Sequence, residues 1–296
     1  MDTPLIQLEF SCEALEEGLS PLFLFGLRKR FQPAFSKAVG CWQPTGGCTA
    51  GDECPCRQVF SRELATDPDA LRRFQKPPLP FAFRLPLLDE ELLPGDGFSF
   101  SLVLTGSCTN HLETCIAATR AALPGSIRIS STSSVAFDGS RRKIPMRSGC
   151  PDLTALPIIS MSDLMQGGDA VVDHLTISIE TPLRLLSKGY PLRTVDFSVL
   201  AGALFRRISS LAYYYGGVEP DFDFKWLAEK AREISIDSSH AGWVSWGGSI
   251  QGVLGNIEIS GDLSELLPFL KVGELLNVGK GAAYGMGSYR LSVEHK

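Results

Sequence analysis

The residues with the clearest chemical character lie near the C-terminus, in the stretch 278–290. This stretch holds four glycines together with Lys280 and Tyr284. Glycine permits positive φ and close approach of another backbone, so a loop of this kind can present amides beside a cation and an aromatic ring. That combination suits a polyanionic strand whose bases can stack. The alternative is a tight, close-packed crossover under the preceding helix, with Tyr284 as a core aromatic.

The order of the elements around this loop excludes the commonest use of glycine loops. Leucines at helical spacing precede it, and an alternating strand pattern (Tyr289, Leu291, Val293) follows it. Dinucleotide-binding and P-loop motifs run from strand to loop to helix, so that phosphate meets a helix N-terminus. A nucleotide-binding enzyme that uses this loop is therefore disfavoured.

Composition sets the class of protein. With 296 residues, of which 44% are hydrophobic, the chain can form one large or two ordinary domains with real cores. We expect a cytoplasmic protein, because no window reaches the roughly 18 apolar residues of a membrane span and the first residues lack the features of a secretory signal. A net charge of −5 disfavours nonspecific coating of nucleic acid, but a local basic face could still bind RNA.

Both halves of the chain predict the element order β-α-β-β-α-β. This order fits an α+β fold of two tandem ferredoxin-like domains, which we place at residues 1–165 and 166–296. The first half predicts strands at 5–10, 81–85, 98–104 and 127–137 and helices at 22–39 and 112–123. The second predicts a strand near 175–179, helices at 197–211, 224–234 and 263–276, a hairpin at 243–260 and the closing strand.

A cysteine-rich insertion at about 41–60 interrupts the first half. Cys41, Cys48, Cys54 and Cys56 lie within sixteen residues, among glycines that let a loop fold back on itself. Four thiolates would satisfy a structural zinc ion, although the spacing departs from that of paired zinc knuckles. Free or partly oxidised thiols and an iron–sulfur cluster are the alternatives. The other four cysteines are expected to be buried thiols.

Several motifs of the second half occur in one order. They are Thr181-Pro182-Leu183-Arg184, then Phe205-Arg206-Arg207-Ile208-Ser209, then Gly252 and Gly255, then the terminal glycine stretch. Over residues 172–293 the chain thereby resembles the CRISPR-associated repeat-processing endoribonucleases of the RAMP superfamily, the Cas six-type proteins. The resemblance is weaker in the first half, where Pro78-Leu79-Pro80-Phe81 is still similar.

The resemblance implies an antiviral-defence protein that binds the repeat of CRISPR precursor RNA. It implies an endoribonuclease that cleaves by metal-independent attack of the 2′-hydroxyl, leaving a 2′,3′-cyclic phosphate, with no cofactor for catalysis. The implied partners are the repeat or crRNA and other Cas proteins of an effector complex, and no membrane. The rival hypothesis is a catalytically silent subunit that only holds the repeat RNA.

The candidate site residues are cationic or aromatic. Those for RNA binding are Arg30, Arg184, Lys188, Arg193, Arg206, Arg207, Lys280, Tyr284 and Arg290, and those for catalysis are Arg28, Lys29, Lys37 and His111. Relatives commonly place a histidine in or just after the first helix, but this chain has none there. Lysine and arginine could stabilise a charged transition state, yet their pKa values make them poor bases. A solvated polar face for the first helix, and helix capping for His111, remain the alternatives.

Overall fold

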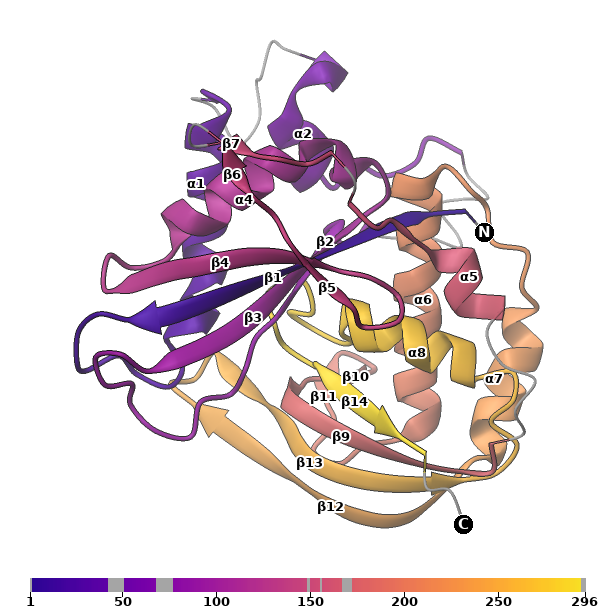
Figure 1. The fold of residues 1–296 in the computed structure, drawn as a ribbon. Helices are drawn as coiled ribbons and strands as arrows, with labels where there is room; N and C mark the ends of the chain where they lie inside the picture. Colours follow the sequence, from indigo (N-terminus) through magenta and orange to yellow (C-terminus); the bar gives the residue numbers. More distant parts are fainter. Residues whose placement is uncertain are drawn as a thin grey trace.

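Two antiparallel sheets, one from each half of the chain, organise the fold and lie with their strands facing each other in Figure 1. The computed structural model describes residues 2–41, 51–67, 77–147, 150–154, 156–166 and 172–293. Within these ranges, none of the helices combines the length and apolar character needed to cross a membrane.

The first sheet has the strand order β2-β3-β1-β4-β5, and β8 pairs with the start of β1. Its strands are β1 (Pro4–Ala14), β2 (Phe81–Arg84), β3 (Gly97–Thr105), β4 (Ile127–Val135), β5 (Arg141–Lys143) and β8 (Ile159–Ser160). β1 alternates between buried and part-exposed positions, because successive side chains point to opposite faces of a sheet. One face therefore covers a core and the other faces the second sheet.

The second sheet has the order β12-β13-β9-β14. Its strands are β9 (His174–Leu183), β12 (Ser235–Trp246), β13 (Ile250–Ser260) and β14 (Tyr289–Ser292). In chain order, both sheets place their four main strands as second, third, first, fourth, which is the ferredoxin-like arrangement expected from the repeated element order. Two short hairpins complete the strands: β6 (Met146–Arg147) with β7 (Cys150–Pro151), and β10 (Leu186–Ser187) with β11 (Tyr190–Pro191).

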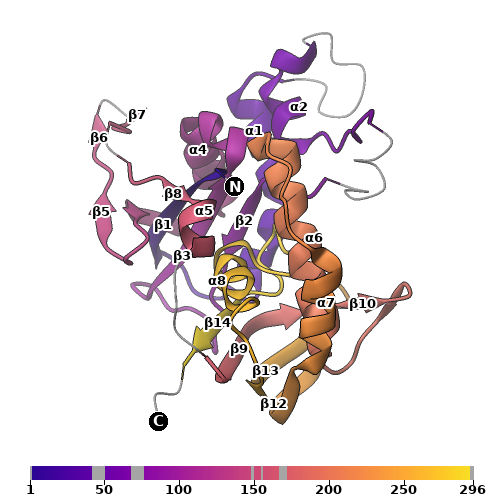
Figure 2. The ribbon, with the colours of Figure 1, turned by 90° about the vertical axis from the view of Figure 1, so that its right-hand side faces the viewer.

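Helices cover the outer faces of the sheets (Figures 1 and 2). In the first half they are η1 (Phe23–Gly26), α1 (Leu27–Ala38), η2 (Gly51–Glu53), α2 (Pro55–Phe60), η3 (Gly106–His111) and α4 (Leu112–Ala122). In the second they are α5 (Met161–Gln166), α6 (Phe197–Gly216), α7 (Phe224–Glu233) and α8 (Leu267–Leu276). Figure 2 shows α6 running from the second sheet up to the helices of the first half. It begins where the Asp196 carboxylate accepts a hydrogen bond from the amide of Val199 at 3.1 Å, an N-cap.

The predicted elements are confirmed in type and order, and several differ in extent: β1 runs on to Ala14, α6 runs on to Gly216 and α8 begins only at Leu267. The predicted helix 22–39 divides into η1 and α1 at Gly26. The strand expected to start at Trp243 starts eight residues earlier, at Ser235. β12 forms the sheet edge and is mostly exposed, so its first half lacks the apolar alternation by which a half-buried strand is identified.

The two halves pack as one structure through the glycine-rich loop, which we define as residues 278–288. Ala283 and Met286 of this loop are buried in the core of the first half. Conversely, Leu5 and Val103 of the first sheet are buried in the core of the second half. The loop is thus positioned against the first half by the same apolar burial that holds each core together.

Candidate nucleic-acid interface

The glycine-rich loop follows α8 and depends on left-handed backbone. Gly279, Gly281, Gly285 and Gly287 all have positive φ, between 68° and 90°. A Cβ at Gly279 would lie 2.7 Å from the carbonyl oxygen of Arg184. Glycine is therefore required here both for its conformation and for close approach of another backbone, as the sequence predicted.

Hydrogen bonds within the second half occupy much of the loop backbone. The amide of Lys280 donates to the Arg184 carbonyl at 2.9 Å, that of Val278 to Gly287 at 3.0 Å, and that of Tyr284 to Gly281 at 2.9 Å. These amides are thereby unavailable to a phosphate. The loop is tightly packed, as in the alternative reading, yet its Lys280 side chain is exposed, so the group it offers to an anion is this ammonium.

A second set of bonds joins the loop to β2 of the first half. The amide of Phe83 donates to the Ala283 carbonyl at 3.0 Å. The side-chain amide of Asn277, which is fully buried, donates to the carbonyls of Phe83 at 2.7 Å and Ala282 at 2.9 Å. Asn277 has a φ of 57° and a ψ of 172°, a strained conformation for any residue other than glycine that the surrounding contacts must hold in place. We call this group of bonds the Asn277 clasp.

Tyr284 lies at the junction that the clasp creates. Its ring meets that of Phe81 edge to face, with 5.5 Å between ring centroids. Burial raises the pKa of Tyr284, and the nearby guanidinium groups of Arg62 and Arg28 offset part of that rise. The phenol is therefore protonated at neutral pH and can donate a hydrogen bond, with two cations of the first half close to it.

The four cations of the first helix do not share one face. Arg28, Phe31 and Phe35 are aligned, since three and seven residues bring a helix back to nearly the same side. Lys29 and Lys37 point about 100° and about 180° away from Arg28 at 100° per residue, and both are exposed. Arg28 is exposed as well, and it is the member of this set whose charge acts on Tyr284.

Arg30 has a different environment from its neighbours. Its guanidinium turns back over Gly26 and donates to the carbonyl oxygen of Phe23 at 3.1 Å. Burial lowers the pKa of Arg30. The Arg30 side chain thus stabilises the turn from η1 into α1. It is half-buried, whereas Lys29 and Lys37 are exposed.

His111 ends η3 and lies beside the C-terminal half of α1. Its Nε2 is 2.6 Å from the side-chain oxygen of Gln58, and its ring meets Phe35 edge to face. Burial lowers the pKa of His111, so the imidazole is neutral at pH 7. Phe35 is seven residues from Arg28, about 10 Å along the helix at 1.5 Å per residue. No side-chain hydrogen bond caps α4 from His111, so the capping alternative is not what holds this residue.

The cations of the second half fall into separate groups. Arg184 is half-buried beside the backbone of Lys280, and Lys188 lies exposed in the hairpin of β10 and β11. Arg193 lies 4.8 Å from the ring centroid of Trp243, a cation–π contact. Arg206 is exposed on α6.

Arg207 and Arg290 are engaged with protein groups. The Arg207 guanidinium donates to the carbonyl of Leu276 at 2.9 Å and to that of Phe81 at 3.4 Å, which joins the two halves. Burial lowers the pKa of Arg207 to about 10, and it stays charged at neutral pH. Arg290 is 67% exposed and pairs with Glu180 at 2.9 Å.

A polar groove of about 490 Å³ lies between the facing sheets. Three arginines line it with two glutamates: Arg141 pairs with Glu9 at 2.7 Å, and Arg84 pairs with Glu180 at 3.5 Å, as does Arg290 at its shorter distance. These pairings leave a formal charge of only about +1 in the groove. The paired carboxylates therefore weaken the attraction of this groove for a polyanion.

Three of the four clustered cysteines lie in the described residues, and Cys48 lies outside them. The Cys56 thiol is 3.5 Å from the hydroxyl of Ser36 and interacts with the thiols of Cys41 and Cys54. Burial raises the pKa of Cys56 to about 11. Within the described part of the chain, no three histidine, cysteine or acidic side chains are placed to hold a metal ion. Zinc binding stays a prediction.

The remaining thiols are buried where the structure describes them. Cys12, Cys108 and Cys115 are at most 3% exposed, as expected, and each is a free thiol. The side chain of Cys150 lies outside the described residues.

Sequence reasoning missed Arg62 and Asn277. Arg62 follows the cysteine-rich insertion and has no motif around it, while Asn277 is one polar residue at the end of an apolar helix. A helix that ends in an asparagine just before glycine is a recognisable C-terminal signal, and it could have marked Asn277 as a left-handed residue. No sequence signal places Arg62 near Tyr284, because 222 positions separate them.

Two family models match the chain. The model described as CRISPR-associated endoribonuclease Cas6 matches residues 177–289, and a model described as an N-terminal domain matches residues 3–130. No curated protein matches the chain.

Solved structures with the same fold include several Cas6 proteins. The chain superposes on a chain of a partial Cas6-RT-Cas1–Cas2 complex with a TM-score of 0.63 and 15% identity, covering 100% of this chain and 47% of that one. It therefore spans about half the length of that chain. A Cas6 product complex gives a TM-score of 0.58 at 16% identity over 98% and 99% of the two chains. Thermus thermophilus Cas6 superposes with a TM-score of 0.57 at 15% identity, covering 99% of this chain and 100% of that one.

At this level of identity the structural matches establish the fold. The repeated ferredoxin-like order, the loop that joins the two halves and these matches agree with one another. Residues 177–289, which include the glycine-rich loop, therefore match the CRISPR-associated endoribonuclease Cas6 model within a two-domain fold that the chain shares with Cas6 structures.

Proposed function

We propose that this protein binds the repeat of CRISPR precursor RNA and cleaves it by attack of a ribose 2′-hydroxyl on the adjacent phosphate, leaving a 2′,3′-cyclic phosphate. The observation that carries the proposal is the match of residues 177–289 to the Cas6 endoribonuclease model, because this stretch holds the glycine-rich loop that packs against the first half and exposes Lys280. The charges of Arg28 and Arg62 in the first half act on Tyr284 of that loop, which supports a cationic site at the junction.

The residues at this junction match the needs of such a reaction. The phosphorane formed by 2′-hydroxyl attack gains negative charge, which the guanidinium groups of Arg28 and Arg62 can stabilise without a divalent ion. The protonated phenol of Tyr284 can donate to a phosphate oxygen or protonate the leaving 5′-oxygen. His111 is neutral at pH 7 and lies farther along the same side of α1, so it is the candidate base.

The cations of the second half would hold the rest of the RNA. Lys280 on the loop and Lys188 in the hairpin of β10 and β11 are exposed, and the half-buried Arg184 lies beside the backbone of Lys280. Each phosphate that such a cation neutralises releases counterions, so binding should weaken as salt increases. Other Cas proteins are further proposed partners, because one similar structure is a Cas6-RT-Cas1–Cas2 complex.

The decisive experiment incubates the purified protein with its own 5′-labelled repeat RNA in excess EDTA. We expect one cut whose product carries a 2′,3′-cyclic phosphate, and no cut when the nucleotide before the scissile phosphate is 2′-deoxy, although that RNA still binds. Tight binding of the unmodified repeat without cleavage would contradict the proposal and establish the rival function, a silent RNA-binding subunit.

Paired variants then locate the chemistry. Arg62→Ala should lower the single-turnover cleavage rate by about 10²-fold, the order found for loss of one charge-stabilising donor, with a much smaller change in RNA affinity. The double variant Lys29→Ala, Lys37→Ala changes cations on other sides of α1. A larger loss of rate in the lysine variant than in Arg62→Ala would return the chemistry to Lys29 and Lys37, two of the catalytic candidates named from the sequence.

A further inference from the structure

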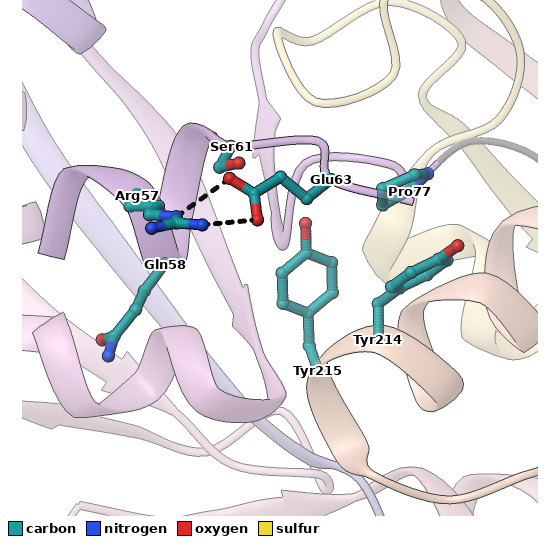
Figure 3. A pocket seen from close by; sticks show the side chains of 7 residues that line it. All are labelled: Arg57, Gln58, Ser61, Glu63, Pro77, Tyr214 and Tyr215. Carbon is teal, nitrogen blue, oxygen red and sulfur yellow. Dashed lines mark hydrogen bonds and ion pairs between the residues drawn. The ribbon is translucent and has the colours of Figure 1, made fainter. Parts of the chain in front are cut away.

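A cavity of about 210 Å³ lies between the segment that follows α2 and the end of α6. Figure 3 shows its walls: Arg57 and Glu63 on one side, and the rings of Tyr214 and Tyr215 rising from α6 on the other. At roughly 30 Å³ per water molecule, the cavity has room for about seven waters, and it is smaller than the roughly 300–1,000 Å³ of pockets for drug-sized ligands. It can take one planar ring system.

The aromatic wall is held in place before any ligand arrives. The Tyr215 hydroxyl donates to the carbonyl of Pro78 at 2.8 Å, and that of Tyr214 accepts a hydrogen bond from the amide of Ala65 at 3.2 Å. Burial raises the pKa of Tyr215, so its ring stays neutral. A fixed ring loses little freedom when a second ring stacks on it.

The opposite wall is polar and planar. The Arg57 guanidinium donates to both carboxylate oxygens of Glu63, from Nε at 2.9 Å and from Nη2 at 2.8 Å. The Gln58 side chain, which contacts His111, lines the same wall. A carboxylate oxygen accepts from amino groups on base edges, whereas it repels a phosphate.

The chain connects this cavity to the junction described above. Arg62 lies between Ser61 and Glu63, which both line the cavity. The charge of Arg62 acts on Tyr215 in the cavity wall and on Tyr284 in the glycine-rich loop. A nucleotide whose phosphate meets Arg62 could therefore place its base in the cavity.

We propose that this cavity, which we call the tyrosine pocket, binds one unpaired nucleobase of the RNA, stacked on Tyr214 and hydrogen-bonded through an exocyclic amine to Glu63. The inference rests on the proposed function, because it takes the ligand to be a nucleotide next to the scissile phosphate. Sequence-specific recognition of RNA commonly uses such splayed-out bases, stacked on aromatic side chains and read on their edges.

The test replaces each unpaired nucleotide of the repeat RNA in turn by an abasic residue and measures affinity. For the wild-type protein one position should lose about 5- to 150-fold, the range for base–aromatic stacking. In Tyr214→Ala the intact RNA should lose affinity by the same factor, and that abasic position should then have no further effect. In Glu63→Gln the preference for a base with an exocyclic amine at that position should fall, while the stacking contribution remains.

Tyr213→Phe is the control, since Tyr213 is the adjacent tyrosine of α6 and lines a neighbouring cavity. Phenylalanine keeps the ring that meets Tyr214 edge to face, with 5.1 Å between ring centroids. Tyr213→Phe should keep the full sensitivity to the abasic position. The pocket proposal is overturned if wild type binds and cleaves the repeat but every abasic penalty is the same in Tyr214→Ala as in wild type. If wild type does not bind the repeat, it is the proposed function that fails, and the two failures are thereby distinguished.

Discussion

Replacing Asn277 by glycine should loosen the joint between the two halves. The Phe83 amide and carbonyl both face the glycine-rich loop, where the amide donates to Ala283 and the carbonyl accepts from Asn277. In Asn277→Gly the Phe83 carbonyl loses its buried side-chain donor, and the Ala282 carbonyl keeps only the bond from the Gly285 amide at 3.4 Å. Glycine adopts the φ of 57° and ψ of 172° without strain. The change therefore removes the clasp without straining the backbone.

The magnitude follows from these two bonds. A buried carbonyl that loses its partner costs about 1–3 kcal/mol, so about 1.5 kcal/mol each gives about 3 kcal/mol. Greater freedom of glycine in the unfolded chain adds about 0.5 kcal/mol, and relief of the backbone strain at Asn277 offsets about 1 kcal/mol. The net loss is about 2.5 kcal/mol, so at roughly 2 °C per kcal/mol for a chain of this size Tm should fall by about 5 °C.

Thermal and urea unfolding, followed by circular dichroism, measure this loss, and Asn256→Gly is the control. Asn256 is exposed on β13, so its replacement reports the cost of glycine alone, about 0.5–1 kcal/mol. Cleavage of repeat RNA by Asn277→Gly, measured below its Tm, should also slow, because Tyr284 and Lys280 follow the clasp in the chain. If Asn277→Gly is no less stable than Asn256→Gly, the clasp does not hold the halves together and the reasoning is refuted.

Three further predictions concern binding, metal and pH. Lys280→Ala should weaken RNA binding and reduce the slope of the log association constant against log salt concentration by about one. Binding titrations at several salt concentrations measure this slope. An unchanged slope would contradict a contact between Lys280 and a phosphate. Elemental analysis should find about one zinc ion per chain, and its removal by a chelator should lower Tm; metal-free protein with the wild-type Tm would rule zinc out. Burial lowers the pKa of His111 in the folded protein, so its contribution to the free energy of unfolding is fully present above the unfolded pKa of about 6.5 and is lost as pH falls toward the folded pKa. In His111→Gln the free energy of unfolding should therefore depend less on pH between pH 7 and pH 5. An unchanged pH dependence would show that this histidine does not titrate on unfolding.

Local sequence pattern was sufficient for the elements of this protein and their order. Alternation marked β1 and β14, and leucines at helical spacing marked α8, because periods of two and 3.6 residues directly reflect which face is buried. The same order in both halves allowed the tandem ferredoxin-like fold to be predicted. β12 was predicted too short, since an edge strand with an exposed first half carries no such pattern.

The glycine-rich loop shows where sequence reasoning about the site succeeded and where it stopped. Four glycines before a closing strand predicted left-handed backbone and close approach, and Gly279 against Arg184 confirms both. The amides expected to face a ligand are instead largely bonded within the protein. Which partner a backbone amide takes depends on packing across the fold, and local composition does not record it.

The sequence by itself determined the residue types available for RNA chemistry and the elements that carry them. Only the tertiary structure decided that the loop bonds to Phe83 of β2, that the charges of Arg28 and Arg62 act on Tyr284, and that Arg207 joins the two halves. Secondary structure depends on neighbours a few residues apart, whereas the bond between Phe83 and Ala283 joins residues 200 positions apart. Such contacts form because burying Ala283 and Met286 in the opposite core brings their segments together.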